Sequence, residues 1–193
     1  MNTHSIVVFI HVMTAMLAFT LVGVELVALP RFLRATTRSE ASGWVHVIET
    51  LGKAHGASAV LFLASGIFLM VKYWHHQPWI DVGMVGLFTL AGLGGGVTGS
   101  TMRGVEKALA SASGNEIPAV VRAAQTGSRL VMSLRVRLSI AIAMVAIMTI
   151  KPGYVESVEI VAVVLIVGWL LGMRADKKQA ARATQNHDRS AAA

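Results

Sequence analysis

Five long apolar stretches constrain the fold more than any other feature of this sequence. They cover residues 5–29, 54–71, 82–102, 130–150 and 158–173. Each is close to the ~20 residues that a helix needs to cross roughly 30 Å of hydrocarbon, although the second and the last are short. Lipid offers the backbone no hydrogen-bond partners, so a spanning segment must satisfy its own polar groups as a helix. The sequence therefore predicts an all-α integral membrane bundle of five transmembrane helices, a four-helix core plus a C-terminal fifth span.

The composition agrees with a membrane domain that fills most of the chain. Hydrophobic residues make up 54% and charged residues only 14%, which is too apolar for a water-exposed surface. We expect one transmembrane domain over residues 1–175 and a disordered polar tail over 176–193. Segment 39–53 is predicted to be a helix that runs into the second span. The first stretch lacks a basic start and is longer than the apolar core of a secretory signal, so we expect it to be retained.

The basic residues indicate the orientation of the bundle. Segments 31–53 and 103–129 and the residues after 173 carry most of the lysine and arginine, whereas the other connections contribute only Lys72 and Lys151. This alternation predicts an outer N-terminus and a cytoplasmic C-terminus. The net charge of +7 is then a mark of topology, and we expect membrane lipids, a second copy or another membrane subunit as partners, and no nucleic acid.

Two ionisable side chains lie within the first span. His11 and Glu25 are fourteen residues apart, which leaves them about 40° from alignment and ~21 Å apart along a helix. The small residues Ala15 and Ala18 lie between them on the same face, together with Val22. Small side chains let a neighbouring helix approach closely, so this face is predicted to point into the bundle. The two polar groups are too far apart to touch, and each needs its own partner.

Glu25 has two candidate partners in the fourth span. Arg135 and Arg137 lie at a similar predicted depth, and an unpaired charge in the membrane is costly. The two arginines face opposite ways, so one is predicted to pair with Glu25 and the other to reach the lipid headgroups. His55 belongs to the same layer and could extend this intramembrane charge network. A structural clamp is favoured over a proton or ion path.

His11 is a candidate ligand because neutral imidazole binds haem iron, copper and zinc. His75, His76 and Asp81 lie near the outer ends of the second and third spans, within reach if those helices are neighbours. The alternative is a histidine bonded to a carbonyl or to water. Met144 has helical spacing with the later Met148 and could supply a thioether, although methionines in such helices are more often packing residues.

Glycines recur at four-residue spacing in the third span. Gly92 pairs with Gly96 and Gly95 with Gly99, a pattern typical of close packing between membrane helices. A dinucleotide fingerprint in the same letters is excluded, because it needs a preceding strand.

Several short motifs resemble known membrane proteins. The stretch FIHVMTAMLAFTLVGVELVALPR, the later GNEIP and the TIKP that closes the fourth span resemble the haem-associated protoporphyrinogen oxidases of the HemJ type and the related CopD-like copper-resistance proteins. The resemblance covers roughly residues 5–152. It implies that His11 takes part in binding haem b, and it matches Arg31 to a family arginine, which makes Arg31 a further candidate cofactor-binding residue. The third-helix lysine of the oxidases has no counterpart, since WIDVGMVGLF carries Asp81 instead.

Together these observations lead to one main hypothesis and two alternatives. We expect a multi-pass protein of the bacterial inner membrane that binds haem b through His11, with His76 or His75 as the second ligand and a redox or porphyrin-handling role. The first alternative is transport of copper or another small ion, or copper resistance. The second is a scaffold subunit without catalysis. Whether the protein is an enzyme is left open by the sequence.

Overall fold

The computed structural model describes the backbone of residues 2–191 and the side chains of residues 2–173. The elements follow the order α1 (Thr3–Arg34), α2 (Arg38–Leu69), η1 (Met70–Trp74), α3 (Pro78–Ala91), η2 (Gly92–Gly99), α4 (Ser100–Ser111), α5 (Ala119–Thr126), α6 (Arg129–Ile150) and α7 (Tyr154–Ala191). The predicted all-α fold class is confirmed, and no strand occurs in this part of the chain. The disorder predicted for 176–193 stays a prediction, because those side chains and residues 192–193 lie outside the described residues.

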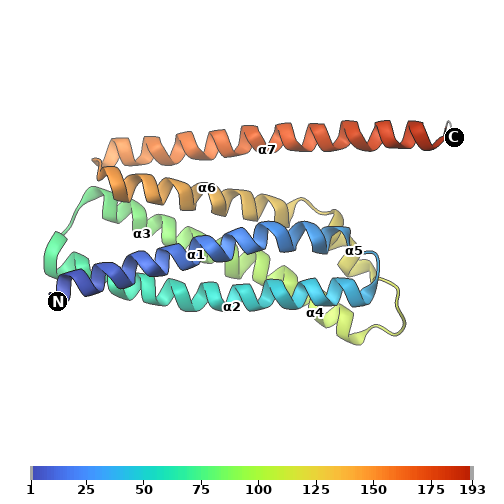
Figure 1. The fold of residues 1–193 in the computed structure, drawn as a ribbon, viewed down its shortest axis with the longest axis horizontal. Coiled ribbons are helices and arrows are strands. Elements are labelled where there is room, and N and C mark those ends of the chain that lie inside the picture. The colour runs from blue at the N-terminus through green and yellow to red at the C-terminus, as the bar shows by residue number, and fades with distance from the viewer. Residues whose placement is uncertain (1, 192–193) are drawn as a thin grey trace.

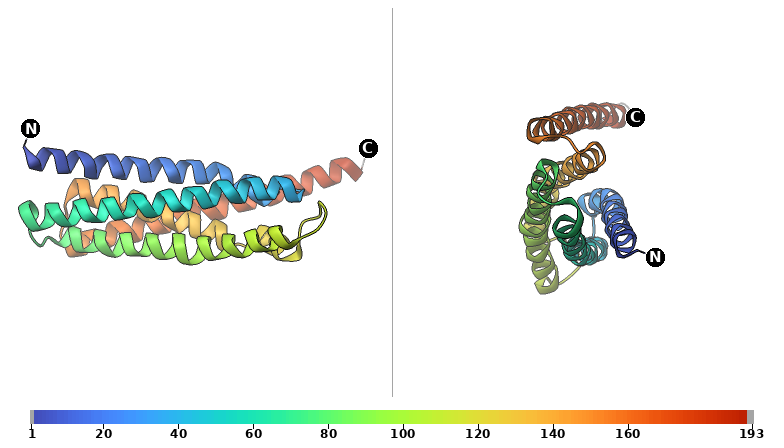
Figure 2. Two further views of the ribbon diagram at one scale, coloured as in Figure 1. Left: turned by 90° about the horizontal axis from the view of Figure 1, so that it is seen from below. Right: turned by 90° about the vertical axis from the view of Figure 1, so that its left-hand side faces the viewer.

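Five helical rods are long and apolar enough to cross a membrane: Thr3–Arg34, Arg38–Trp74, Pro78–Ser111, Arg129–Ile150 and Tyr154–Met173. Each contains one of the five predicted stretches. The rods lie side by side, and the two chain ends lie at opposite ends of the bundle, as an odd number of spans requires (Figure 1). Seen end-on, α7 forms an outer layer against α6, and α1 and α2 lie on the far side of α6 from α7 (Figure 2). Helix α6 is therefore the central element, and half of the residues in its most apolar stretch are buried inside the bundle.

The end of the bundle predicted to be cytoplasmic, the inner end, is where α1 turns into α2 and where α4 and α5 lie. Its side chains form the apolar cluster Val22, Ala28, Leu29, Phe32, Ala35, Ala41, Val45, Ile48, Met102, Val105, Leu109, Val121, Leu130 and Leu134. The carbonyls at a helix end have no partner within the helix. The Gln125 amide donates to the carbonyls of Phe32 and Ala35 at 2.9 and 3.0 Å, and Arg38 Nε donates to that of Leu109 at 2.9 Å. The inner end is thus closed by specific hydrogen bonds around a packed core.

The glycine-rich segment differs from the prediction. Residues Gly92–Gly99 form the π-helix η2, and a Cβ placed at Gly92, Gly95 or Gly96 would meet no atom within 4 Å in the described part of the chain. A π turn holds an extra residue and rotates the face that follows it, so the four-residue pattern no longer points at a neighbouring helix. Gly92, Gly95 and Gly96 therefore do not pack closely against another helix of the described chain. Gly94 is the one that faces the bundle, beside Arg137.

A different pair of glycines seats the fifth span. Gly168 and Gly172 of α7 face α6, where a Cβ at Gly168 would overlap Ser139 and one at Gly172 would lie 3.0–3.1 Å from the Arg135 guanidinium. Small residues at this spacing let two membrane helices approach closely. The sequence reasoning missed this pair because it looked for glycines in the third span.

We expect Gly168→Leu to destabilise the bundle by roughly 1–3 kcal/mol, because the added side chain overpacks the contact between α6 and α7. Gly23→Leu is the matched control, since a Cβ there meets nothing within 4 Å, and its effect should stay within about 0.5 kcal/mol. Unfolding in detergent micelles followed by circular dichroism measures both. Equal effects of the two substitutions would contradict close packing at Gly168.

Candidate functional site

One turn of α2 holds the imidazole of His11. The ring stacks on Phe62 with ring centroids 4.1 Å apart and an interplanar angle of 25°. Its Nδ1 lies 2.9 Å from the hydroxyl oxygen of Ser65. Gly66 leaves room for the ring, because a Cβ there would lie 3.2 Å from His11 Cε1. Phe62, Ser65 and Gly66 therefore fix both the position and the tilt of the imidazole.

The bond to Ser65 also selects the tautomer of His11. A serine hydroxyl has one hydrogen, and Ser65 Oγ lies 2.7 Å from the carbonyl oxygen of Leu61 and 3.0 Å from that of Phe62. With its hydrogen directed at these carbonyls, Ser65 accepts the hydrogen of His11 Nδ1. The Nε2 atom is then unprotonated and carries the free lone pair. This is the state in which a histidine binds a metal, and a partner on the other nitrogen is the usual way to orient such a ligand.

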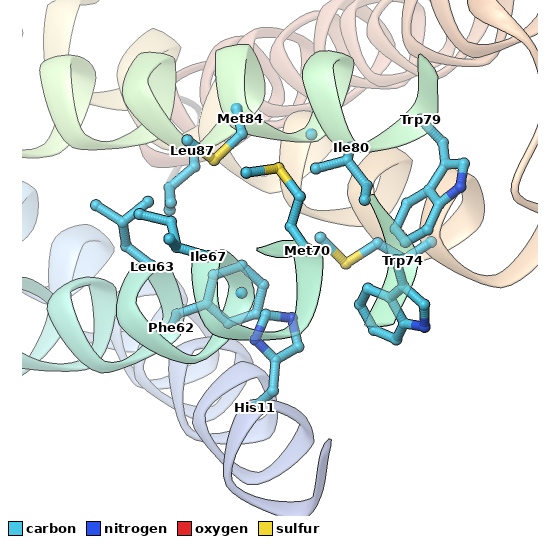
Figure 3. A pocket seen from close by; sticks show the side chains of 13 residues that line it. His11, Phe62, Leu63, Ile67, Met70, Trp74, Trp79, Ile80, Met84 and Leu87 are labelled. Carbon is cyan, nitrogen blue, oxygen red and sulfur yellow. The ribbon is translucent and has the colours of Figure 1, made fainter. Parts of the chain in front are cut away.

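His11 lines a cavity of about 40 Å³ between α1, the end of α2 with η1, and α3 (Figure 3). Its lining is His11, Phe62, Leu63, Gly66, Ile67, Met70, Trp74, Trp79, Ile80, Gly83, Met84, Leu87 and Met148. In Figure 3 the side chains of Met70 and Met84 approach each other from η1 and α3, on the side of the cavity away from His11. The cavity therefore combines one imidazole with three thioethers, and its other side chains are apolar or aromatic.

The donor set restricts which group could be held here. Among the described residues, no three histidine, aspartate or glutamate side chains are grouped as a metal site. Imidazole nitrogen with thioether sulfur is a soft set, which suits copper(I). Enclosed cofactor sites measure roughly 300–1,000 Å³, whereas about 40 Å³ holds little more than one water-sized particle. The residues present therefore fit a single soft ion and do not fit an enclosed haem.

The two other predicted ligand histidines lie away from His11, at the opposite end of the bundle from the inner end, here called the outer end. His76 Nδ1 lies 3.2 Å from an oxygen of Asp81, with 82% of the His76 side chain exposed. The other Asp81 oxygen accepts a hydrogen bond from Tyr154. His75 is exposed in a left-handed conformation (φ 54°), and neither His75 nor His76 lines the cavity. The structure therefore does not bring either histidine together with His11 at the cavity.

Arg31, which the family resemblance assigns to the cofactor, is exposed near the inner end of α1. It lies twenty residues beyond His11 along one helix, a separation of about 30 Å. The two residues therefore cannot hold one compact cofactor.

Glu25 pairs with Arg137, one of its two candidate partners. Arg137 Nη1 donates to Oε2 of Glu25 at 2.9 Å, and Nη2 donates to Oε1. The two side chains are only 7% and 5% exposed. Nη2 also reaches Thr98 of η2 at 3.4 Å, and Thr98 in turn bonds to Ser133 at 3.0 Å. A bidentate pair with neutral partners joins α1, η2 and α6 at one level of the bundle.

The remaining members of the predicted charge network lie elsewhere. Arg135 faces α7 beside Gly172, on the opposite side of α6 from Glu25. His55 Nδ1 donates to the carbonyl of Leu51 in its own helix at 3.1 Å, so that ring does not join the Glu25–Arg137 pair. The clamp thus consists of one arginine, one glutamate and the hydroxyl of Thr98.

Several site residues were not predicted. Ser65, Gly66, Met70 and Met84 were passed over because single small or thioether residues in an apolar span are ordinary packing residues. A usable signal was the adjacent Ser65–Gly66 pair at the outer half of the second span. It marks a point where a bulky ring from a neighbouring helix fits.

Comparison of the chain with protein-family models, with curated proteins and with solved structures finds no match. The resemblance to the HemJ and CopD types therefore stays a prediction.

We expect Glu25→Gln to destabilise the protein by about 3–5 kcal/mol, because it leaves the Arg137 charge buried without a counter-charge. Combined replacement, Glu25→Leu with Arg137→Leu, should recover most of this loss, since two apolar side chains of similar size need no partner in that layer. Denaturation in detergent, read by circular dichroism, gives both values. If the double variant were as unstable as Glu25→Gln, the unpaired charge of Arg137 would not be the main cause of the lost stability.

Proposed function

We propose that the protein is an integral membrane protein that binds one copper(I) ion in the outer half of the bundle. The observation that carries the proposal is the hydrogen bond from His11 Nδ1 to Ser65. It leaves the lone pair of Nε2 available to a metal ion, at a cavity that is also lined by thioethers. Met70, Met84 and Met148 are the candidate sulfur ligands. When bound, the ion supplies a soft Lewis-acid centre, and these side chains hold it.

The chemistry of the cavity supports copper(I) over the other metals considered. The lining side chains are neutral, so a monovalent ion is less costly to place there than a divalent ion that retains its full charge. Thioethers select copper(I), and a neutral imidazole suits the same metal. Hard cations such as magnesium prefer carboxylate and water oxygens, which the cavity lining does not provide.

The packing between the two polar layers favours binding over passage. Val22 lies on the same face of α1 as His11 and Glu25, is 7% exposed and belongs to the apolar cluster of the inner end. Closer to the inner end than Val22, Glu25 is paired with Arg137. A transported ion would have to cross this packed level, so the arrangement supports retention or handling of copper at the outer half.

Anaerobic titration of the detergent-purified protein with copper(I), in competition with a chromophoric chelator, tests the proposal. We expect one ion per chain, and at least tenfold weaker binding in His11→Ala and Met70→Leu. Met16→Leu is the matched control: Met16 lies on the same helix as His11 but is 58% exposed toward the lipid, so its loss should leave the affinity unchanged.

Two outcomes would overturn the copper proposal. One is wild-type protein that takes up no copper(I) from the chelator. The other is a Soret band after haem-supplemented expression that disappears in His11→Ala, which would establish haem binding at His11 in spite of the small cavity.

We expect Ser65→Ala to weaken copper(I) binding by about tenfold, because His11 then loses the acceptor that fixes its tautomer and orientation. Ser58→Ala is the control. Ser58 is a buried serine of the same helix, and its hydroxyl bonds only to the carbonyl of His55, at 3.1 Å. The same chelator competition measures both. Equal affinities of the Ser65 and Ser58 variants would show that Ser65 does not position the ligand.

A further inference from the structure

Two tryptophans at the outer end hold a lysine ammonium. The rings of Trp74 and Trp79 lie 5.4 Å apart between centroids and are inclined by 61°. The Nζ of Lys151 lies 5.6 Å from the first ring centroid and 5.7 Å from the second. Both distances are within the range of a cation–π interaction. One ammonium is therefore shared by two aromatic rings from η1 and α3.

The end of α6 places this lysine. Helix α6 ends at Ile150, and Lys151 takes a left-handed conformation (φ 55°, ψ 52°) while its N–H donates to the carbonyl of Ile147 at 2.8 Å. Residues other than glycine adopt this conformation at some cost. Pro152 follows and prevents the helix from continuing. The turn between α6 and α7 thus fixes the backbone of Lys151 beside the two rings.

The same two rings line the cavity of His11. Trp79 is only 6% exposed and Trp74 is partly buried, whereas Lys151 is exposed. The ammonium therefore lies against two rings of the cavity wall, while Lys151 itself is not among the lining residues. Of the other charged groups at this end, Asp81 is engaged by His76 and Tyr154, and Lys72 and Glu156 are exposed.

We propose that Lys151 is a cationic guard of the copper(I) cavity, whose ammonium is held against the Trp74–Trp79 pair of the cavity wall. This inference rests on the proposed copper function. A positive charge held against the wall lowers the affinity of the cavity for a second cation, so Lys151 sets how tightly copper(I) binds.

Removing the charge should strengthen copper(I) binding. A unit charge on the other side of a cavity wall, at an effective dielectric constant of about 20, weakens the binding of a cation by on the order of tenfold. We therefore expect Lys151→Gln to bind copper(I) about tenfold more tightly in the chelator competition, with Lys151→Arg close to wild type because it keeps the charge and stacks on the rings. Lys72→Gln removes the same net charge from the same end and should leave the affinity within about twofold, because it is Lys151, and not Lys72, whose ammonium is held over the rings that line the cavity.

A second measurement examines the guard without copper. In a Trp44→Phe/Trp169→Phe background, the remaining fluorescence comes from Trp74 and Trp79. Caesium is a cationic quencher and acrylamide a neutral one. Lys151→Gln should increase quenching by caesium about twofold or more, with a smaller change for acrylamide, since the ammonium repels the cation as well as covering the rings. Lys151→Arg should restore the wild-type ratio of the two quenchers.

The two readouts separate the guard from the copper site. If wild-type protein binds no copper(I) while caesium quenching rises selectively in Lys151→Gln, the copper function fails and the ammonium still guards the rings. If wild-type protein binds copper(I) but Lys151→Gln alters neither the affinity nor the caesium-to-acrylamide ratio, the guard is overturned and the copper site stands. A Lys72→Gln effect as large as that of Lys151→Gln would also overturn it, because it would reduce the role of Lys151 to net charge.

Discussion

The bidentate pair between Glu25 and Arg137 is the constraint on which the rest of the bundle depends. Hydrocarbon cannot solvate either charge, so the two side chains must meet at one depth and in one orientation. That requirement fixes the rotation of α6 against α1. The bond from Arg137 to Thr98 and the Thr98–Ser133 contact then bring η2 to the same level. With α6 fixed in this way, its opposite face presents Ser139 and Arg135 to the glycines of α7.

The two halves of the bundle are packed in different ways, and the candidate site follows from that difference. The inner half is filled by a continuous apolar cluster and closed by the side-chain hydrogen bonds of Gln125 and Arg38. The outer half contains the cavity, whose walls include three methionines and two glycines. Methionine is unbranched and adapts to irregular spaces, so a small cavity lined by it can change shape around an ion. A packed inner end beside a cavity in the outer half agrees with the proposal that an ion is held without a path through the membrane.

Much of the fold was predictable, because the length of an apolar stretch is a property of a single segment. The shared face of His11 and Glu25 was predictable for the same reason, since helical spacing is local. The choice between Arg135 and Arg137 was not. They are two residues apart on one helix, and only the packing of α6 against both α1 and α7 decides which of them meets Glu25. Ser65 was missed because the register between α1 and α2 selects it. His76 lies beside Asp81 at the outer end, as expected, but it does not line the cavity of His11.

Under the proposed copper function, the sign of the charges at the outer half relates the neutral donor set of the cavity to Lys151. An imidazole and thioethers give a cation coordination without counter-charge, so a bound copper(I) ion leaves a net charge of +1 in a poorly solvated cavity. Such a site binds tightly only if no other positive charge is near. Lys151 is placed where its ammonium is stabilised by aromatic rings in place of a carboxylate, an attraction weak enough to be broken. An acidic partner for Lys151 would have neutralised the lysine and removed its influence on the cavity. The aromatic pair keeps the charge in place and active, which is the property that a guard of a cation site requires.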